Sequence, residues 1–270
     1  MKKFFGVIFF SWLTIATPVS AQTNDWPTSK QVENTSELWL GLYTKYRIQE
    51  RLYYYGEYHL RSRDFAREMA QIYLRFGISY IVNPNFEFTA GVVTPFYWAP
   101  KPVAENTDAV VPQYRGWQQF LFIMPFPRLK IYHQLRTEQR WRRDYEVGSP
   151  FELTHRFRYK ILGYFPLNHH KLESNTLFLS MYEEIFIQAG KSIVFNHLED
   201  NRVFVGLGYI LNDNIQFQTG YQWSFRHRNS PFVYENRHML RFSVYHNFDF
   251  YQRKEMRSKS ISRIDPIGHH

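Results

Sequence analysis

Arginine and glutamate residues recur at every second position along several segments of this 270-residue chain, and they are the residues best placed to do chemistry. Alternate positions of an extended chain share one face, so these charges would gather on one side of each strand. The charged residues predicted to line an enclosed interior are Glu57, Arg61, Arg75, Arg136, Glu138, Arg140, Arg156, Arg158, Glu184 and Arg202. By the same alternation, further charges on these faces are Arg63, Glu87, Lys160 and Arg241.

Two kinds of chemistry are open to such a set of charges. The charges can pair across neighbouring strands and fill a narrow lumen, each exposed or wet pair adding modest stability. Alternatively, the excess of guanidinium groups can line a pore that favours anions, because their planar fork suits carboxylate and phosphate groups. The first alternative is the structural one, and the second predicts a small anionic solute as a partner.

The segments that would carry these charges have the period of β-strands. In residues 71–82 every second side chain, from Ile72 to Val82, is apolar or aromatic, while Arg75 and Ser79 lie on the opposite face. This alternation predicts a strand with one apolar and one polar face. Only residues 115–124 have apolar side chains on both faces. Strands are predicted at about 37–47, 51–63, 69–82, 85–97, 114–125, 128–141, 152–165, 175–187, 200–210, 214–225 and 236–248.

The connections between these strands alternate in length. Short turns follow the first, third, fifth and ninth strands, and all but the first of these turns contain Asn or Pro. Longer polar links such as 98–113 and 188–200 lie between them. This is the pattern of an outer-membrane barrel with short periplasmic turns and long outer loops. With eleven strands and the last one ending on the periplasmic side, the first strand must begin on the outer side. Residues 22–36 must then cross the membrane level, as a weak first strand or as a segment threaded through the lumen. Even strand numbers in bacterial barrels favour twelve strands, with ten as the alternative.

The first 21 residues have the pattern of a secretory signal peptide. Lys2 and Lys3 precede an apolar run, and small residues end at Ala21 before a predicted cut. Cleavage would lower the formal net charge of +9 by two. The chain has no cysteine, which excludes disulfides, thiolate metal sites and a lipoprotein anchor. After residue 21, no apolar run is long enough for a transmembrane helix.

A soluble exported β-sandwich or lipocalin-like barrel would also alternate, with its apolar face inward. The predicted strands of ten to fourteen residues exceed the usual soluble length of about five or six and match a tilted membrane crossing. Aromatic residues near the strand ends predict interfacial girdles: Trp39, Tyr97, Trp98, Trp117, Trp141 and Trp223. The sequence therefore predicts an all-β fold, a single antiparallel transmembrane barrel over residues 37–250. A basic tail at 251–270 follows it.

Several segments resemble one family. They are His133–Trp141, Arg156–Tyr159, Tyr182–Phe186 and Asn201–Tyr209, and they are similar to segments of the domain-of-unknown-function family 2490. That family is a group of predicted outer-membrane barrels common in Bacteroidota. The resemblance spans about residues 37–250 and implies the fold and the compartment, but no activity.

No catalytic, cofactor-binding or metal-binding residue is predicted, and the chain is not expected to be an enzyme. The alternative is a hydrolase at the rim or in the lumen, acting on envelope lipids or glycans. It would need a histidine base and a nucleophile, yet no serine is spaced to pair with His59 or His238. The pair His169–His170 lacks a third metal ligand. The expected partners are outer-membrane lipid and the barrel-insertion and periplasmic chaperone machinery. Nucleic acid is not expected, because the arginines alternate into an interior.

Overall fold

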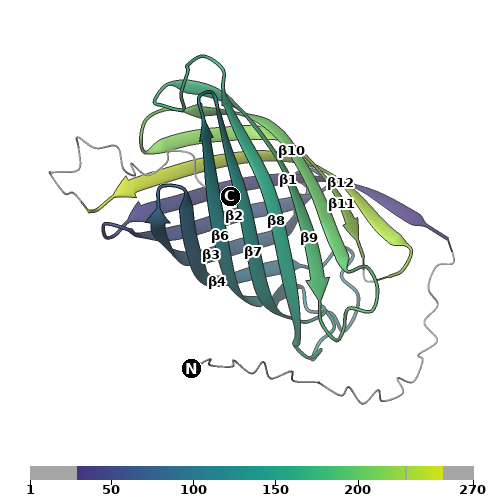
Figure 1. Ribbon diagram of the computed structural model, residues 1–270. Helices are drawn as coiled ribbons and strands as arrows, with labels where there is room; N and C mark the ends of the chain where they lie inside the picture. Colours follow the sequence, from purple (N-terminus) through teal and green to yellow (C-terminus); the bar gives the residue numbers. More distant parts are fainter. Residues whose placement is uncertain (1–28, 229, 252–270) are drawn as a thin grey trace, which may run out of the picture.

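The computed structural model describes residues 29–228 and 230–251, and the regular elements of these residues are all strands (Figure 1). No helix in this part of the chain is long and apolar enough to span a membrane. The predicted signal peptide, the following residues to 28, and all but the first residue of the predicted basic tail lie outside the described residues.

The strands follow the predicted order with bounds close to those expected. They are β1 (Gln31–Arg47), β2 (Leu52–Arg63), β3 (Glu68–Asn83), β4 (Phe86–Trp98), β5 (Val110–Pro112), β6 (Tyr114–Phe126), β7 (Leu129–Arg142), β8 (Glu152–Pro166), β9 (Thr176–Ala189), β10 (Leu198–Ile210), β11 (Ile215–His227) and β12 (Val233–Asp249). The turns after β1, β3, β6, β8 and β10 lie at one end of the barrel, here called the short-turn end. The opposite end, with the other connections, is the long-link end.

Eleven of these strands form a closed ring, and the short β5 adds to the edge of β4. The all-β barrel of about twelve strands predicted from the sequence is thereby confirmed. The twelfth strand is β5, inside the predicted link at 98–113, whereas residues 31–36 form the first part of β1.

The ring closes through a parallel pair, not through an antiparallel one. β1 and β12 lie side by side and point the same way (Figure 1, purple and yellow), with Gln31 opposite Val233 and Arg47 opposite Asp249. An odd number of strands joined by antiparallel steps leaves the first and last strands pointing in the same direction, so they can pair only in parallel. The barrel is therefore mixed.

The apolar face of each strand forms the outer wall. Leu40 lies beside Leu60 of β2 and Phe242 of β12, and Phe120 lies beside Leu135 of β7, and all five side chains are exposed. The register continues this face from strand to strand around the ring. A soluble monomer rarely exposes an apolar surface of this extent. The structure confirms that the apolar residues face outward and the charges inward.

Part of the interior near the short-turn end is apolar, whereas the buried pair Lys45–Glu87 joins β1 and β4 at the same end. A cluster of buried side chains joins strands β6 to β10 there: Leu121, Tyr132, Leu162, Tyr164, Phe178, Tyr182, Phe204 and Ile210. These residues explain why 115–124 has apolar side chains on both faces, since the inner face of β6 enters this cluster while its outer face joins the wall. We call this group the apolar plug.

Three residues predicted to form outer girdles lie inside instead. Trp39 and Trp117 are only 4% and 0% exposed, and Tyr97 accepts a hydrogen bond from the inward Arg115 at 2.6 Å. Tyr97 and Trp117 do lie near strand ends, but Trp39 lies at the middle of β1, which begins at Gln31. The parity of all three places them on the inner face. Trp141 is exposed on the outer wall, as predicted.

The apolar plug depends on an inward glycine. Gly208 of β10 lies opposite Phe178 of β9, and a Cβ added at Gly208 would overlap the Phe178 ring. We expect Gly208→Ala to lower the free energy of unfolding by about 1–3 kcal/mol, because overpacking a filled core forces side chains off their preferred positions. Denaturant unfolding followed by tryptophan fluorescence measures this change.

Gly163→Ala is the matched control on the outer face of β8, where the added Cβ would have its nearest neighbour, Leu129 Cδ1, at 3.8 Å. Its effect should stay within about 0.5 kcal/mol. Equal stability of the two variants would show that Phe178 does not cover Gly208.

Candidate functional site

The charged interior is centred on Glu138 of β7. Four arginines from three other strands contact this carboxylate: Arg75 at 3.1 Å, Arg115 at 3.4 Å, Arg156 at 2.5 Å and Arg158 at 2.8 Å. Arg75 is on β3, which is separated from β7 by β4 and β6, so this pair crosses the lumen. Glu138 is completely buried.

Three further carboxylates extend these contacts. Glu57 pairs with Arg75 at 3.0 Å, and Glu184 pairs with Arg158 at 2.5 Å. Glu199 joins Arg140 at 2.8 Å and Arg156 at 3.4 Å. We call the connected set the ion-pair network: Glu57, Glu138, Glu184, Glu199, Arg75, Arg115, Arg136, Arg140, Arg156, Arg158 and Lys160.

A second group of charges lies near the long-link end. Asp200 contacts Arg202 at 2.7 Å and Arg237 at 2.9 Å, and it accepts a hydrogen bond from Ser224 at 2.6 Å. Arg237 also reaches Glu37 of β1 at 3.4 Å. Strands β1, β10, β11 and β12 are thus tied together by their inner faces.

Aromatic rings separate the guanidinium groups. Trp117 lies between Arg75 and Arg136, with its ring 4.8 and 4.9 Å from their Cζ atoms. Phe186 lies beside Arg158 at 4.6 Å and Arg202 at 4.2 Å. Such cation–π contacts stabilise charges held away from water.

The structure places all ten predicted lumen residues on the inner face. Nine of them belong to ion pairs, and Arg61 instead stacks on Trp39 at 3.8 Å and donates a hydrogen bond to Gln71. The prediction missed Arg115, because its strand has no clear polar face. It also omitted Arg237, although this residue lies in the predicted strand 236–248 and shares the parity of Arg241.

Two further acids were missed for a different reason. Glu199 and Asp200 are consecutive residues and are both buried. A register shift between Leu198 and Asp200 breaks the alternation at this point. Sequence parity cannot place two neighbours on one face, and these residues fell at the end of a predicted loop.

The network fills the lumen. No side chain in it is more than 10% exposed, so a water-sized sphere has little access to any of these charges. Because buried charges are costly without partners, they must satisfy one another. The arrangement supports a closed interior that joins opposite walls.

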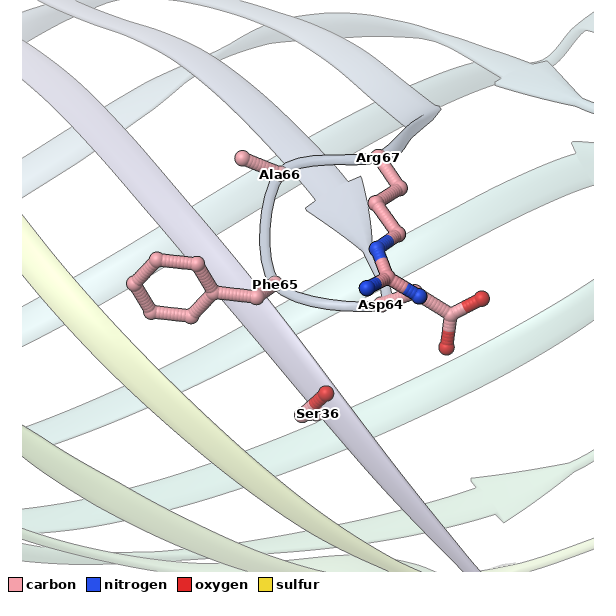
Figure 2. Close-up of a pocket in the computed structure, with 5 residues that line it drawn as sticks. All are labelled: Ser36, Asp64, Phe65, Ala66 and Arg67. Carbon is pink, nitrogen blue, oxygen red and sulfur yellow. The ribbon is translucent and has the colours of Figure 1, made fainter.

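A surface hollow of about 540 Å³ lies at the turn between β2 and β3. Figure 2 shows its lining residues Ser36, Asp64, Phe65, Ala66 and Arg67, with the Phe65 ring pointing away from Asp64 and Arg67. The Phe65 backbone N–H donates to the Ser36 carbonyl at 3.2 Å, which holds this turn against β1. The hollow has no converging set of buried polar groups.

The histidines of the described residues contact groups other than serine. His133 and His238 are hydrogen-bonded to tyrosine hydroxyls on the outer wall, and buried His59 lies 3.6 Å from Glu57. Among residues 29–228 and 230–251, no serine is hydrogen-bonded to a histidine. The same residues contain no group of three or more His, Asp or Glu side chains placed to hold a metal ion.

Glu138→Gln removes the charge at the centre of the ion-pair network. We expect a loss of about 3–5 kcal/mol in the free energy of unfolding, because four buried guanidinium groups lose their shared counterion. The measurement is denaturant unfolding of the refolded barrel. Combining the change with Arg115→Gln should cost less than the sum of the single changes, because the two side chains are in contact.

The control is Glu183→Gln, which makes the same chemical change one residue before Glu184 on the outer face, where Glu183 is exposed and accepts a bond from Asn201. Its effect should be about 0.5 kcal/mol or less. If Glu138→Gln is equally mild, the interior charges are hydrated rather than mutually paired.

The comparisons with known proteins agree with the resemblance noted in the sequence. No curated protein matches the chain. The model of one family, described as "Protein of unknown function (DUF2490)", matches residues 36–236. This match takes in most of the barrel and every residue of the ion-pair network. The chain therefore belongs to the DUF2490 family of proteins of unknown function.

Proposed function

We propose that this protein is an outer-membrane β-barrel of a Gram-negative bacterium, with a structural role and a lumen closed by its own side chains. In this proposal the signal peptide is cleaved after Ala21, and periplasmic chaperones and the barrel-insertion machinery deliver the chain. The protein has no cofactor and is not an enzyme. The observation that carries the proposal is the combination of an exposed apolar outer wall with buried, paired charges inside.

The outer wall supports a lipid environment. Membrane strands need about nine to eleven residues when tilted, and the ring strands of this barrel have at least 12. Exposed apolar side chains continue around the ring. Transferring these side chains from water into lipid would be favourable through the hydrophobic effect. The short turns would face the periplasm and the long links the outside.

The interior supports a structural role over a pore. The ion-pair network and the apolar plug both occupy the lumen, so an ion that crossed it would have to displace paired or packed side chains. A conducting pore needs sites that an ion can enter and leave. The alternative of a rim or lumen hydrolase has no arrangement of residues in its favour among the described part of the chain.

An arginine on the outer wall tests the membrane environment. Val205, in the middle of β10, is 46% exposed and faces outward between Met181 and Tyr221. We expect Val205→Arg to destabilise the inserted barrel by about 2–4 kcal/mol, the depth-dependent effect of a charge facing lipid. The measurement is the amount of folded, heat-modifiable protein in the outer-membrane fraction of a Gram-negative host, with N-terminal sequencing expected to give Gln22.

Val194→Arg makes the same change in the link between β9 and β10, where Val194 is 71% exposed, and it should leave that amount unchanged. On a soluble protein both substitutions would be tolerated alike. Recovery of the wild-type chain in a soluble fraction, or full tolerance of Val205→Arg, would contradict the membrane assignment.

Planar bilayer recordings test the closed lumen. We expect the reconstituted wild-type barrel to give no discrete conductance steps, because paired side chains obstruct the lumen at several levels. The recording should use a preparation whose folding is established by its heat-modifiable mobility. Discrete anion-biased openings would contradict the structural role and favour the pore.

A further inference from the structure

One row of inward residues in the barrel contains cations but no acid. Arg61 of β2 lies opposite Trp39 of β1, and Trp39 lies opposite Arg241 of β12. The row continues to Gln71 of β3 on one side and to Gly220 of β11 on the other. The strand register therefore places one guanidinium group on each side of the Trp39 indole ring.

Neither guanidinium has a carboxylate partner among the described residues. Arg61 donates to Gln71 Oε1 at 2.9 Å and stacks on Trp39, and its Nε is buried without a hydrogen bond. Arg241 donates to the hydroxyls of Tyr43, at 2.9 Å, and Tyr182, and to Gln222 Oε1 at 3.1 Å. Neutral oxygens and a ring face satisfy these donors, but no carboxylate forms a direct ion pair with either charge.

A third guanidinium approaches the same indole from another part of the wall. Arg202 of β10 lies 5.5 Å from the Trp39 ring, compared with 3.8 Å for Arg61 and 5.9 Å for Arg241. Arg202 pairs with Asp200, and the Trp39 indole donates a hydrogen bond to Glu37 at 2.6 Å. Both carboxylates are also paired with Arg237, so the two acids at this site are outnumbered by the four arginines around them. Arg61 and Arg202 keep some solvent exposure, unlike the Glu138 contacts deeper in the network.

The imbalance extends to the ion-pair network. Among the described residues, the seven cations of this network pair with four carboxylates, so the network itself has an excess of positive charge. Holding like charges together away from water is unfavourable unless an anion joins them. Guanidinium groups prefer oxygen acceptors that can take two parallel N–H bonds.

We propose that Arg61, Arg202 and Arg241 form, around Trp39, a binding site for a small oxyanion, a phosphate or a carboxylate. The bound anion neutralises the two arginines that lack an acid and links β2, β10 and β12 through the interior. The site requires only the barrel interior, so it does not depend on where the protein resides or on whether the lumen conducts.

Isothermal titration calorimetry of the full barrel, refolded in an uncharged detergent, tests the site. The titrants are sodium phosphate, sodium acetate and sodium chloride at constant ionic strength. We expect saturable binding of phosphate or acetate, with at least about tenfold weaker affinity in Arg61→Gln and Arg241→Gln, the loss expected when a charge-assisted hydrogen bond is removed. Phosphate and acetate distinguish the two sources of the oxyanion.

Arg128→Gln is the control, because Arg128 is exposed near the short-turn end, with its Cζ 5.3 Å from the Phe165 ring. Its affinity should equal that of the wild type. If the buried Arg241 variant does not fold, the partly exposed Arg61 variant decides alone. The proposal is overturned if neither oxyanion binds saturably, if Arg61→Gln binds as tightly as the wild type, or if chloride binds as tightly as the oxyanions. None of these results bears on the location or closure of the barrel.

Discussion

The mutual neutralisation of charges inside a closed wall is the constraint on which this barrel depends. Its lumen is too narrow to hydrate guanidinium and carboxylate groups, so most of these groups pair with one another, in many cases across strands. Glu138 is an example, because its carboxylate forms ion pairs with arginines from β3, β6 and β8. A buried pair of this kind adds little net stability over an apolar core, but breaking it is costly. The network therefore selects one register and one strand order more than it raises the overall stability.

Two further groups of side chains fill the interior, the apolar plug and the aromatic rings between the cations. The apolar plug occupies the β6 to β10 side of the short-turn end, where Leu121, Tyr132 and Phe178 pack together. Aromatic rings such as Trp117 separate the cations in the middle of the lumen and offer them a polarisable face. Together these layers give the molecule an inside that resembles the core of a globular protein. The outside has the character that such a core would normally have.

Inner-face side chains also stabilise the parallel pair β1–β12 that closes the ring. Because β1 and β12 point the same way, their seam lacks the tight antiparallel pairing present elsewhere in the wall. Inner-face contacts cross it, including Arg237 of β12 with Glu37 of β1 and the Tyr43–Tyr245 stack at 4.8 Å. The seam is thus held from within, by the interior chemistry that the proposed oxyanion site would complete at Trp39.

The sequence by itself determined the strands, their apolar faces and the inward direction of the ten predicted charges, because a period of two is a local property of an extended chain. It also indicated about twelve strands and the family. Parity failed where the backbone departs from regular alternation, at Glu199 and Asp200, and where proximity to a strand end suggested a girdle for Trp39 and Trp117. Only the tertiary structure decided the parallel closure and the partner of each charge. The parallel closure follows from the number of strands that enter the ring, because β5 pairs only with the edge of β4. The partner of each charge depends on which strands face each other across the lumen, and ring closure fixes this, not a local pattern.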